Sequence, residues 1–188
     1  MAVEVLPATG RWDDFASFMV PRKSGGGGCV CMSYRNSGLG MPERIEYMRS
    51  ACAAEPGPGV LVYLDDQVAG WCSVAPKSTY RRLMRSRTIP HLDEESDPWS
   101  IVCFVVRGGF RKRGLMHDLL DGAVEHARAS GAAIVEGYPA ESPGDRVDVI
   151  SGYVGTVRLF EAHGFERFAA TEAHSGGAQR WVMRRTLV

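Results

Sequence analysis

The sequence lacks a net charge, because its 22 lysines and arginines are balanced by 22 aspartates and glutamates. A protein whose main role is to hold a nucleic-acid backbone usually carries a basic excess, so this balance argues against a nucleic-acid partner. An apolar run long enough to cross a membrane is also missing, and the first twenty residues contain no apolar signal segment. We therefore expect a cytoplasmic protein with no membrane partner.

Cysteine is scarce and scattered, with five residues in 188. An odd number at irregular spacing does not fit the disulfide framework of a small secreted domain. Cys29 and Cys31 are the nearest approach to a metal-binding pair, yet no second Cys or His pair with familiar zinc spacing accompanies them. The sequence therefore predicts reduced thiols and no metal site.

What the sequence does have is the composition of one globular domain. Hydrophobic residues make up 45% of the chain and charged residues 23%, close to the usual balance of folded proteins. A chain of this length can bury a full core. We expect a single domain over residues 1–188.

The first half of the chain predicts two helices and a hairpin. A short strand near residues 3–6 precedes helices over about 12–19 and 42–53, where apolar residues recur at helical spacing. "VLVYLDDQVAGWCSVAP" (60–76) then contains two β-rich segments around a polar turn, which is the pattern of an antiparallel hairpin.

The second half predicts a strand, helix, strand unit. "SIVCFVV" (100–106) has the continuous apolar character of a strand buried on both faces. It leads through a helix that begins near Gly114 into a second strand, "AIVEGYP" (133–139), so the two strands should lie parallel. A short helix in "TVRLFEAH" and two terminal strands complete a mixed α/β protein.

Three stretches have no clear period. Residues 80–99 change from basic to acidic and predict a solvated excursion on the surface. Four consecutive glycines (25–28) and the Gly, Pro and Asp rich residues 141–155 predict loops, since glycine has high backbone entropy and no side chain to pack.

The most informative stretch is "VVRGGFRKRGLMHDLL" (105–120), which places three glycines and four basic residues between the buried strand and the next helix. Backbone N–H groups in a first helical turn have no internal partner, and the helix dipole adds about half a positive charge there. Such a turn suits a phosphate group; a basic patch for nucleic acid and a plain solvated turn are the alternatives. The stretch is neither a Walker sequence nor a dinucleotide fingerprint.

This stretch resembles the pyrophosphate-binding loop of the GNAT superfamily of acyl-CoA N-acyltransferases. The superfamily motif is Arg or Gln, two residues, Gly, one residue, and Gly or Ala. Arg111 and Gly114 match it, while Met116 replaces the small third residue. The later stretch "LFEAHGF" (159–165) resembles the superfamily's Leu-Tyr-Glu-x-x-Gly-Phe helix, with Phe160 in place of the tyrosine.

The resemblance implies the GNAT fold: N-terminal helices, antiparallel hairpin strands, then a strand, helix, strand unit whose parallel strands splay apart to form an acyl-CoA cleft. It also implies acetyl-CoA as the cosubstrate and a reaction that needs no metal. The pantetheine arm would pair with the backbone of the first splayed strand, and the pyrophosphate would lie on the glycine turn. The implied cofactor-binding residues are Phe104, Val105, Val106, Arg111, Lys112, Arg113, Gly114, Leu115, Met116 and Thr156.

The resemblance further implies direct attack of a primary amine on the thioester in a ternary complex. A backbone N–H of the first splayed strand would bind the developing oxyanion, a type of donor whose loss costs about 3 kcal/mol in other enzymes. Glu136, a carboxylate in an otherwise apolar strand, is the candidate base; the alternative is an exposed or paired carboxylate. Because Phe160 cannot donate a proton, Tyr153 is the candidate acid for the departing thiolate, with water as the alternative. The N-terminal acceptor site would be lined by Cys29, Cys31, Tyr34 and Arg35.

The leading hypothesis is therefore a cytoplasmic N-acetyltransferase that acts on a small-molecule or peptide amine. The resemblance also implies a homodimer, because dimers are common among members of the superfamily. A non-catalytic acyl-CoA sensor or interaction protein of the same fold is the alternative, because the helix tyrosine is missing. A nucleic-acid binder that uses the basic clusters at 81–87 and 107–113 is a third hypothesis, against which the zero net charge argues.

Overall fold

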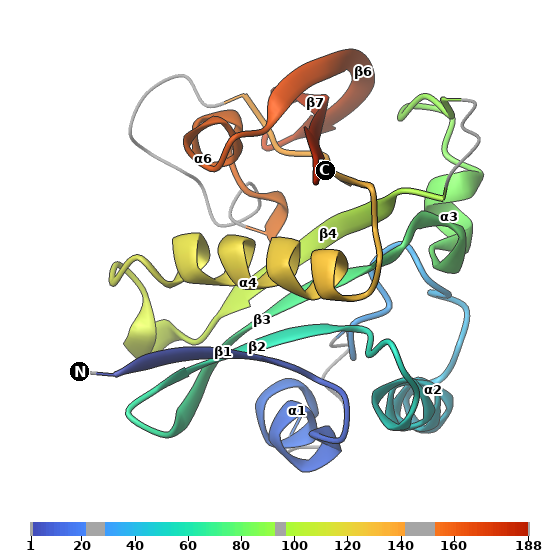
Figure 1. Ribbon diagram of the computed structural model, residues 1–188. Coiled ribbons are helices and arrows are strands. Elements are labelled where there is room, and N and C mark those ends of the chain that lie inside the picture. Colours follow the sequence, from blue (N-terminus) through green and yellow to red (C-terminus); the bar gives the residue numbers. More distant parts are fainter. Residues whose placement is uncertain (1, 22–28, 93–96, 142–152, 188) are drawn as a thin grey trace.

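The computed structural model describes residues 2–21, 29–92, 97–141 and 153–187. One sheet of seven strands runs through this described part of the chain, in the order β1-β2-β3-β4-β5-β7-β6 (Figure 1). The strands are β1 (Val3–Pro7), β2 (Gly59–Leu64), β3 (Gln67–Pro76), β4 (Trp99–Val106), β5 (Ile134–Gly137), β6 (Glu166–Ser175) and β7 (Ala178–Thr186). The predicted glycine loop at 25–28 and most of the predicted loop at 141–155 lie outside the described residues.

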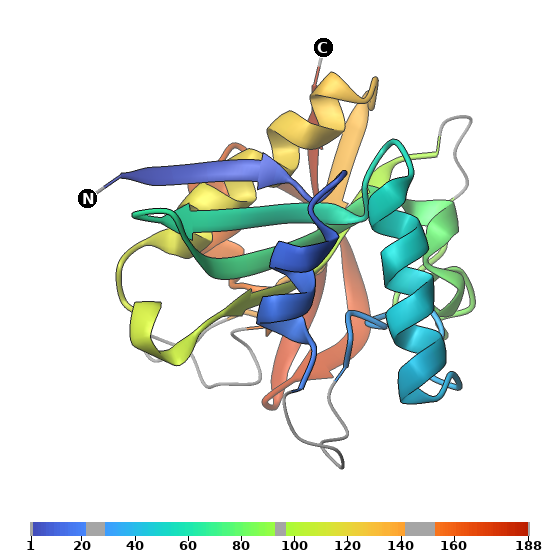
Figure 2. The same cartoon turned by 90° about the horizontal axis from the view of Figure 1, so that it is seen from below.

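Helices cover both faces of the sheet. Figure 2 shows α1 and α2 in front of the strands and α4 behind them. The α-helices are α1 (Trp12–Met19), α2 (Met41–Ala53), α3 (Arg81–Met84), α4 (Leu115–Ala129) and α6 (Val157–Ala162). None of these helices in the described ranges is long and apolar enough to cross a membrane. The predicted mixed α/β class is confirmed.

The β2/β3 hairpin turns through two residues, Asp65 and Asp66. Both have positive φ angles, 47° and 63°, which is the requirement of the tight turn that matches the twist of two-residue hairpins. Aspartate tolerates this left-handed backbone better than most residues, so the polar turn predicted from the sequence has a direct physical cause.

The strand, helix, strand unit has the predicted direction. β4 and β5 are parallel neighbours, and α4 connects them across one face of the sheet. The apolar stripe of α4 includes Leu115, Leu119 and Val124, which are buried against the sheet together with Phe104 and Phe160. At roughly 1.5–3 kcal/mol for each fully buried large apolar side chain, this layer is the main anchor of α4.

The stretch predicted to be a solvated excursion is partly core. α3 forms within it, and Tyr80, Leu83 and Ile89 are buried in a cluster with Tyr138. The prediction was wrong because the basic residues around Leu83 hid a single turn of helix whose apolar side faces the sheet. The acidic part, residues 93–96, lies outside the described residues.

Candidate active site

β4 and β5 pair over three residues only, Trp99, Ser100 and Ile101 of β4. β4 then continues for five residues beside β3, whereas the chain after Gly137 turns to other neighbours. The splay begins at a β-bulge, because Val102 has no partner between the pairs Ser73↔Cys103 and Val74↔Ile101. Bulges of this kind bend a strand and are frequent beside active sites.

The backbone of the second half of β4 is divided between β3 and the splay. The N–H of Arg107 donates to the carbonyl of Ala69 on β3. Because successive residues of a strand point to opposite edges, Val106 and Phe104 turn their backbone groups away from β3, toward the splay. Two of the three predicted cofactor residues of β4 therefore present backbone there, and Val105 presents its backbone to β3.

The glycine turn after β4 has the conformation of an anion cradle. Lys112 and Gly114 both have left-handed backbone, with φ of 62° and 81°. A Cβ at Gly114 would have no atom within 4 Å, so the space beside it is open. In the first turn of α4, His117 N–H bonds back to the carbonyl of Gly114, while the two N–H groups before it have no intrahelical acceptor.

The basic side chains of the turn surround this opening. Arg111, Lys112 and Arg113 are exposed, and Arg111 Nε donates to the carbonyl of Val106 at 3.2 Å. Leu115 is buried and Met116 half-buried, so both contribute backbone rather than reactive groups. The turn thus combines open N–H donors, a helix N-terminus and three cations, which together suit a pyrophosphate.

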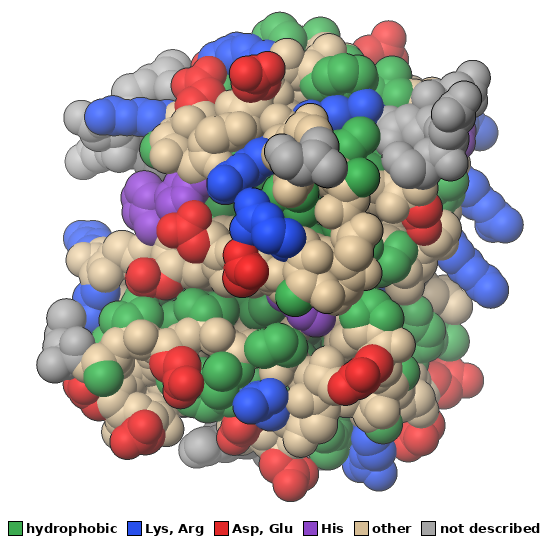
Figure 3. Space-filling model, viewed as in Figure 1, with side chains coloured by type: hydrophobic (Ala, Val, Ile, Leu, Met, Phe, Trp, Pro, Cys, Tyr) green, Lys and Arg blue, Asp and Glu red, His purple; other side chains and the backbone are tan. Residues whose placement is uncertain are grey.

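On the face shown in Figure 3, basic and acidic side chains are interspersed over the coloured, described surface. Basic side chains do not form a continuous stripe across this part of the molecule, as a nucleic-acid backbone would require.

The segment that enters α6 lies beside the end of β5. The carbonyl of Gly155 accepts from Ala140 N–H, and Thr156 bridges to the same residue. Thr156 caps α6, since its hydroxyl oxygen accepts from Leu159 N–H at 3.2 Å. Tyr153 lies two residues before Gly155. It is 42% exposed, which leaves its phenol accessible.

Phe160 forms part of the floor where the strands separate. Its ring is fully buried, and a Cβ at Gly137 would clash with its Cε1 atom. The ring also packs edge-on against Phe104 and Phe165. The position that carries a tyrosine in the resembled motif is therefore held by an apolar ring with no proton to give.

Glu136 lies on the opposite face of the sheet from α4 and is 0% exposed. Its Oε1 is 2.6 Å from Lys77 Nζ and accepts from the phenol of Tyr138 at 2.8 Å, and its Oε2 accepts from Arg184 Nε at 2.8 Å. The Tyr138 phenol also lies 2.8 Å from Ser100 Oγ. Burial, followed by the charge of Glu136, raises the pKa of Tyr138 well above its ordinary value.

This network gives Glu136 the paired state that the sequence left open, with both oxygens engaged. Its role as a base stays a prediction. Sequence reasoning missed its partners: Tyr138 follows Glu136 by two residues, and strand alternation puts both on one face, so that residue was detectable. Lys77, on the short 3-10 turn Lys77–Thr79 after β3, carries no such signal.

The N-terminal residues predicted to line the acceptor site divide into two groups. Cys31 and Arg35 are buried under the sheet, where Trp71 Nε1 lies 2.9 Å from Cys31 Sγ. Tyr34 is half-buried and faces Arg180 of β7, while Cys29 is exposed. Among the described residues, His, Cys, Asp and Glu side chains form no group of three that could hold a metal ion.

A family model described as the acetyltransferase (GNAT) family matches residues 29–141. No curated protein matches the chain significantly in sequence.

Several solved structures share the fold. The chain is similar to an acetyltransferase of the GNAT family from Streptococcus pneumoniae, with 14% identity, a TM-score of 0.61 and 100% of each chain covered. It is similar to yncA from Salmonella typhimurium with its cofactor acetyl-CoA, with 11% identity, a TM-score of 0.56, and 100% of this chain and 95% of that chain covered. It is also similar to a chain of the NatC complex bound to Gag peptide and CoA, with 14% identity, a TM-score of 0.58 and 100% of each chain covered.

Proposed function

The chain belongs to the acetyltransferase (GNAT) family, and on this premise we propose that it transfers an acetyl group from acetyl-CoA to a primary amine. The observation that carries the proposal is the splay of β4 from β5 at the Val102 bulge, with the open glycine turn of α4 at its end. A parallel pair that separates beside a helix N-terminus offers strand backbone and an anion cradle to one extended ligand.

The residues present fit an acyl-CoA. Its pyrophosphate would be held by the N–H groups of the turn from Arg111 to Met116, with exposed cations around it. Its pantetheine amides would find the backbone of Phe104 and Val106, which faces the splay. A substituent on Gly114 would enter the open space, so the sequence there leaves room for a ligand.

The reaction is acyl transfer by direct attack. The amine nitrogen forms a bond to the thioester carbonyl carbon, and the carbon–sulfur bond breaks. The amine loses a proton, and the departing thiolate accepts one to give free CoA. A β4 backbone N–H directed into the splay would stabilise the oxyanion, as preorganised donors do in other acyl transfers. The structure supports this role through the unpaired edge of β4 beyond Ile101 in the described part of the sheet.

The proton transfers use groups at the end of β5. Tyr153, exposed beside the Gly155–Ala140 contact, is the proposed donor to the thiolate, since Phe160 has no proton to give. A thiol leaves readily near neutral pH because its pKa is about 8.5, so this donor needs to supply only part of the rate. Glu136 is the proposed acceptor of the amine proton, through the Tyr138 phenol that touches it.

The proposal is tested by offering the purified protein acetyl-CoA and a library of primary amines, from small molecules to peptides. Thiol release is followed continuously, and the product is weighed by mass spectrometry for the addition of one acetyl group. Amine-dependent thiol release with an acetylated product supports the proposal. Binding of acetyl-CoA without turnover of any amine would instead support the sensor of the same fold, which the buried Phe160 favours. A cytoplasmic location and a homodimer are part of the proposal and are tested by cell fractionation and light scattering.

A further inference from the structure

Arg180 of β7 is a buried cation that forms no ion pair with the acidic side chains of the described residues. It is 6% exposed, and its two hydrogen-bond partners are neutral: Nε donates to the Tyr138 carbonyl and Nη1 to the Tyr34 phenol, both at 2.7 Å. Its remaining nitrogen, Nη2, is buried and has no hydrogen-bond partner among the described residues. A buried charge is costly unless it is paired, and an unused buried donor adds to that cost.

Another buried arginine shows what a purely structural role requires. Arg35 is 2% exposed, and its terminal nitrogens donate to two backbone carbonyls and to the hydroxyl of Ser73, with further contacts to Cys31 and Tyr80. Both of its terminal nitrogens are therefore used by the protein itself. Arg180 differs because its terminal nitrogen Nη2 has no partner among the described residues.

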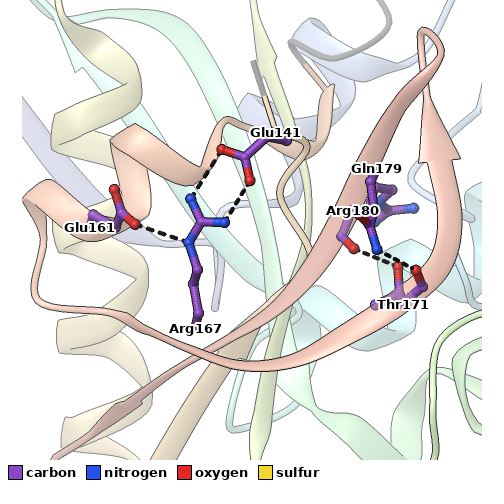
Figure 4. Close-up of polar contacts among 6 residues, drawn as sticks. All are labelled: Glu141, Glu161, Arg167, Thr171, Gln179 and Arg180. Atoms are coloured by element: carbon purple, nitrogen blue, oxygen red, sulfur yellow. Dashed lines mark hydrogen bonds and ion pairs between the residues drawn. The ribbon is translucent and has the colours of Figure 1, made fainter. Parts of the chain in front are cut away.

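The backbone of Arg180 is held in place by side chains. The Thr171 hydroxyl donates to the Arg180 carbonyl, and the Gln179 amide donates to the Thr171 carbonyl, as Figure 4 shows. These contacts lie where the β6/β7 ladder is irregular, between Ala170 and His174. The protein thus fixes Arg180 at a point where regular strand pairing does not.

Arg180 lies next to the proposed reaction centre. Tyr138, whose carbonyl it binds, is the first residue after the last β4/β5 pair. Tyr34, which accepts from the guanidinium, packs with Cys103 against the buried cluster that contains Val102 and Tyr138. This is the face of the sheet opposite α4, away from the cofactor turn.

We propose that Arg180 binds a carboxylate of the acceptor, so that the substrate is a small amine that also carries a carboxylate, as a free amino acid does. The inference rests on the proposed acetyl transfer and names its substrate class. A carboxylate supplies the missing anion and accepts from Nη2, and charge-assisted bonds of this kind are the strong ones. The amino group of such a molecule would then point toward the splay.

The first test uses the wild-type protein with pairs of amines that differ only in the carboxylate. Each L-amino acid is compared with its α-amide, and kcat/KM for thiol release from acetyl-CoA is measured. We expect the acid to exceed the amide by at least about tenfold, because a site built for a charged group rejects an analogue that lacks it. Equal values for acid and amide across all pairs would overturn the proposal.

The second test uses Arg180→Gln and Arg180→Lys, with Arg185→Gln as the matched control. Arg185 is also an arginine of β7, but its Nη1 donates to the His163 carbonyl near α6. We expect Arg180→Gln to abolish the preference for the acid and to leave the acetyl-CoA affinity within about twofold of wild type. Arg180→Lys should keep part of the preference, because it keeps the charge. An unchanged acid-to-amide ratio in folded Arg180→Gln would contradict the proposal.

Binding measurements separate this inference from the proposed function. The affinity of the acetyl-CoA analogue desulfo-CoA, measured by calorimetry, reports on the cofactor site alone. If that ligand binds and the loaded protein then binds an amino acid more tightly than its amide, the carboxylate site is supported even when turnover is absent. If the loaded protein shows no such difference, the carboxylate site is refuted while the acyl-CoA site stands.

Discussion

The ammonium of Lys77 and the carboxylate of Glu136 lie 2.6 Å apart, and both side chains are buried. They come from different parts of the sheet, since Lys77 follows β3 and Glu136 is in β5. Arg184 and Tyr138 complete the coordination of the carboxylate. Glu136 is therefore a buried anion that contacts three side chains on this face of the sheet.

Glu136→Gln is expected to lower the free energy of unfolding by about 3–5 kcal/mol, because it leaves the buried Lys77 without its counter-charge. Urea denaturation measures this. The double variant Lys77→Met/Glu136→Gln is the control, and it should lose much less than the sum of the two single variants. Strictly additive losses would mean that the pair is not coupled.

The proposed pyrophosphate site is tested with two glycines that have similar positive φ angles. Gly114 and Gly131 have φ of 81° and 85°, lie at opposite ends of α4, and have no atom within 4 Å of a built Cβ. Valine at either position should cost about 1–2 kcal/mol of stability from the left-handed backbone. Only Gly114→Val is expected to weaken acetyl-CoA binding, by about tenfold or more, or about 1.4 kcal/mol.

Calorimetric titration of both variants distinguishes the effects. Equal acetyl-CoA affinity of Gly114→Val and Gly131→Val would place the pyrophosphate elsewhere.

Stability should fall in mild acid because of His126. This residue is 8% exposed, its Nε2 lies 3.1 Å from the Gly57 carbonyl, and burial lowers the pKa of its imidazole. The unfolded chain takes up a proton near the ordinary pKa of about 6.5, whereas the folded protein does so only at lower pH. The contribution of His126 to the free energy of unfolding is therefore constant above about pH 6.5. It declines as the pH falls below about 6.5.

His126→Gln removes this titration and keeps a hydrogen-bond donor. Its stability, measured by urea denaturation from about pH 8 to pH 5, should show a smaller decline below about pH 6.5 than wild type. Parallel curves for the two proteins in that range would assign the acid sensitivity to other groups.

Tyr153→Phe tests the proposed general acid. Loss of a proton donor to the thiolate should reduce kcat by about 10²-fold, while acetyl-CoA affinity stays unchanged because the phenol is not one of the groups proposed to hold the cofactor. The measurement is steady-state thiol release with a turned-over amine. Full activity would show that water protonates the thiolate.

The sequence alone determined the class of fold and the place of the glycine turn. Both depend on local signals: apolar runs and helical spacing define the strands and helices, and the match of Arg111 and Gly114 to a motif indicates the glycine turn. The resemblance to the GNAT superfamily drawn from these residues is confirmed by the family model over residues 29–141 and by the seven-stranded sheet. Local patterns were sufficient here because the glycine turn and the helix it opens are continuous in the chain.

Only the tertiary structure decided the surroundings of the candidate site residues. Glu136 was a lone carboxylate in the sequence, and its partner Lys77 is 59 residues away, so no periodicity could pair them. Arg180 and Tyr34 are separated by 146 residues and meet because the last strand of the chain packs beside the end of β5. Charge pairing and burial depend on distance in space, and in this protein the order of strands in the sheet sets that distance.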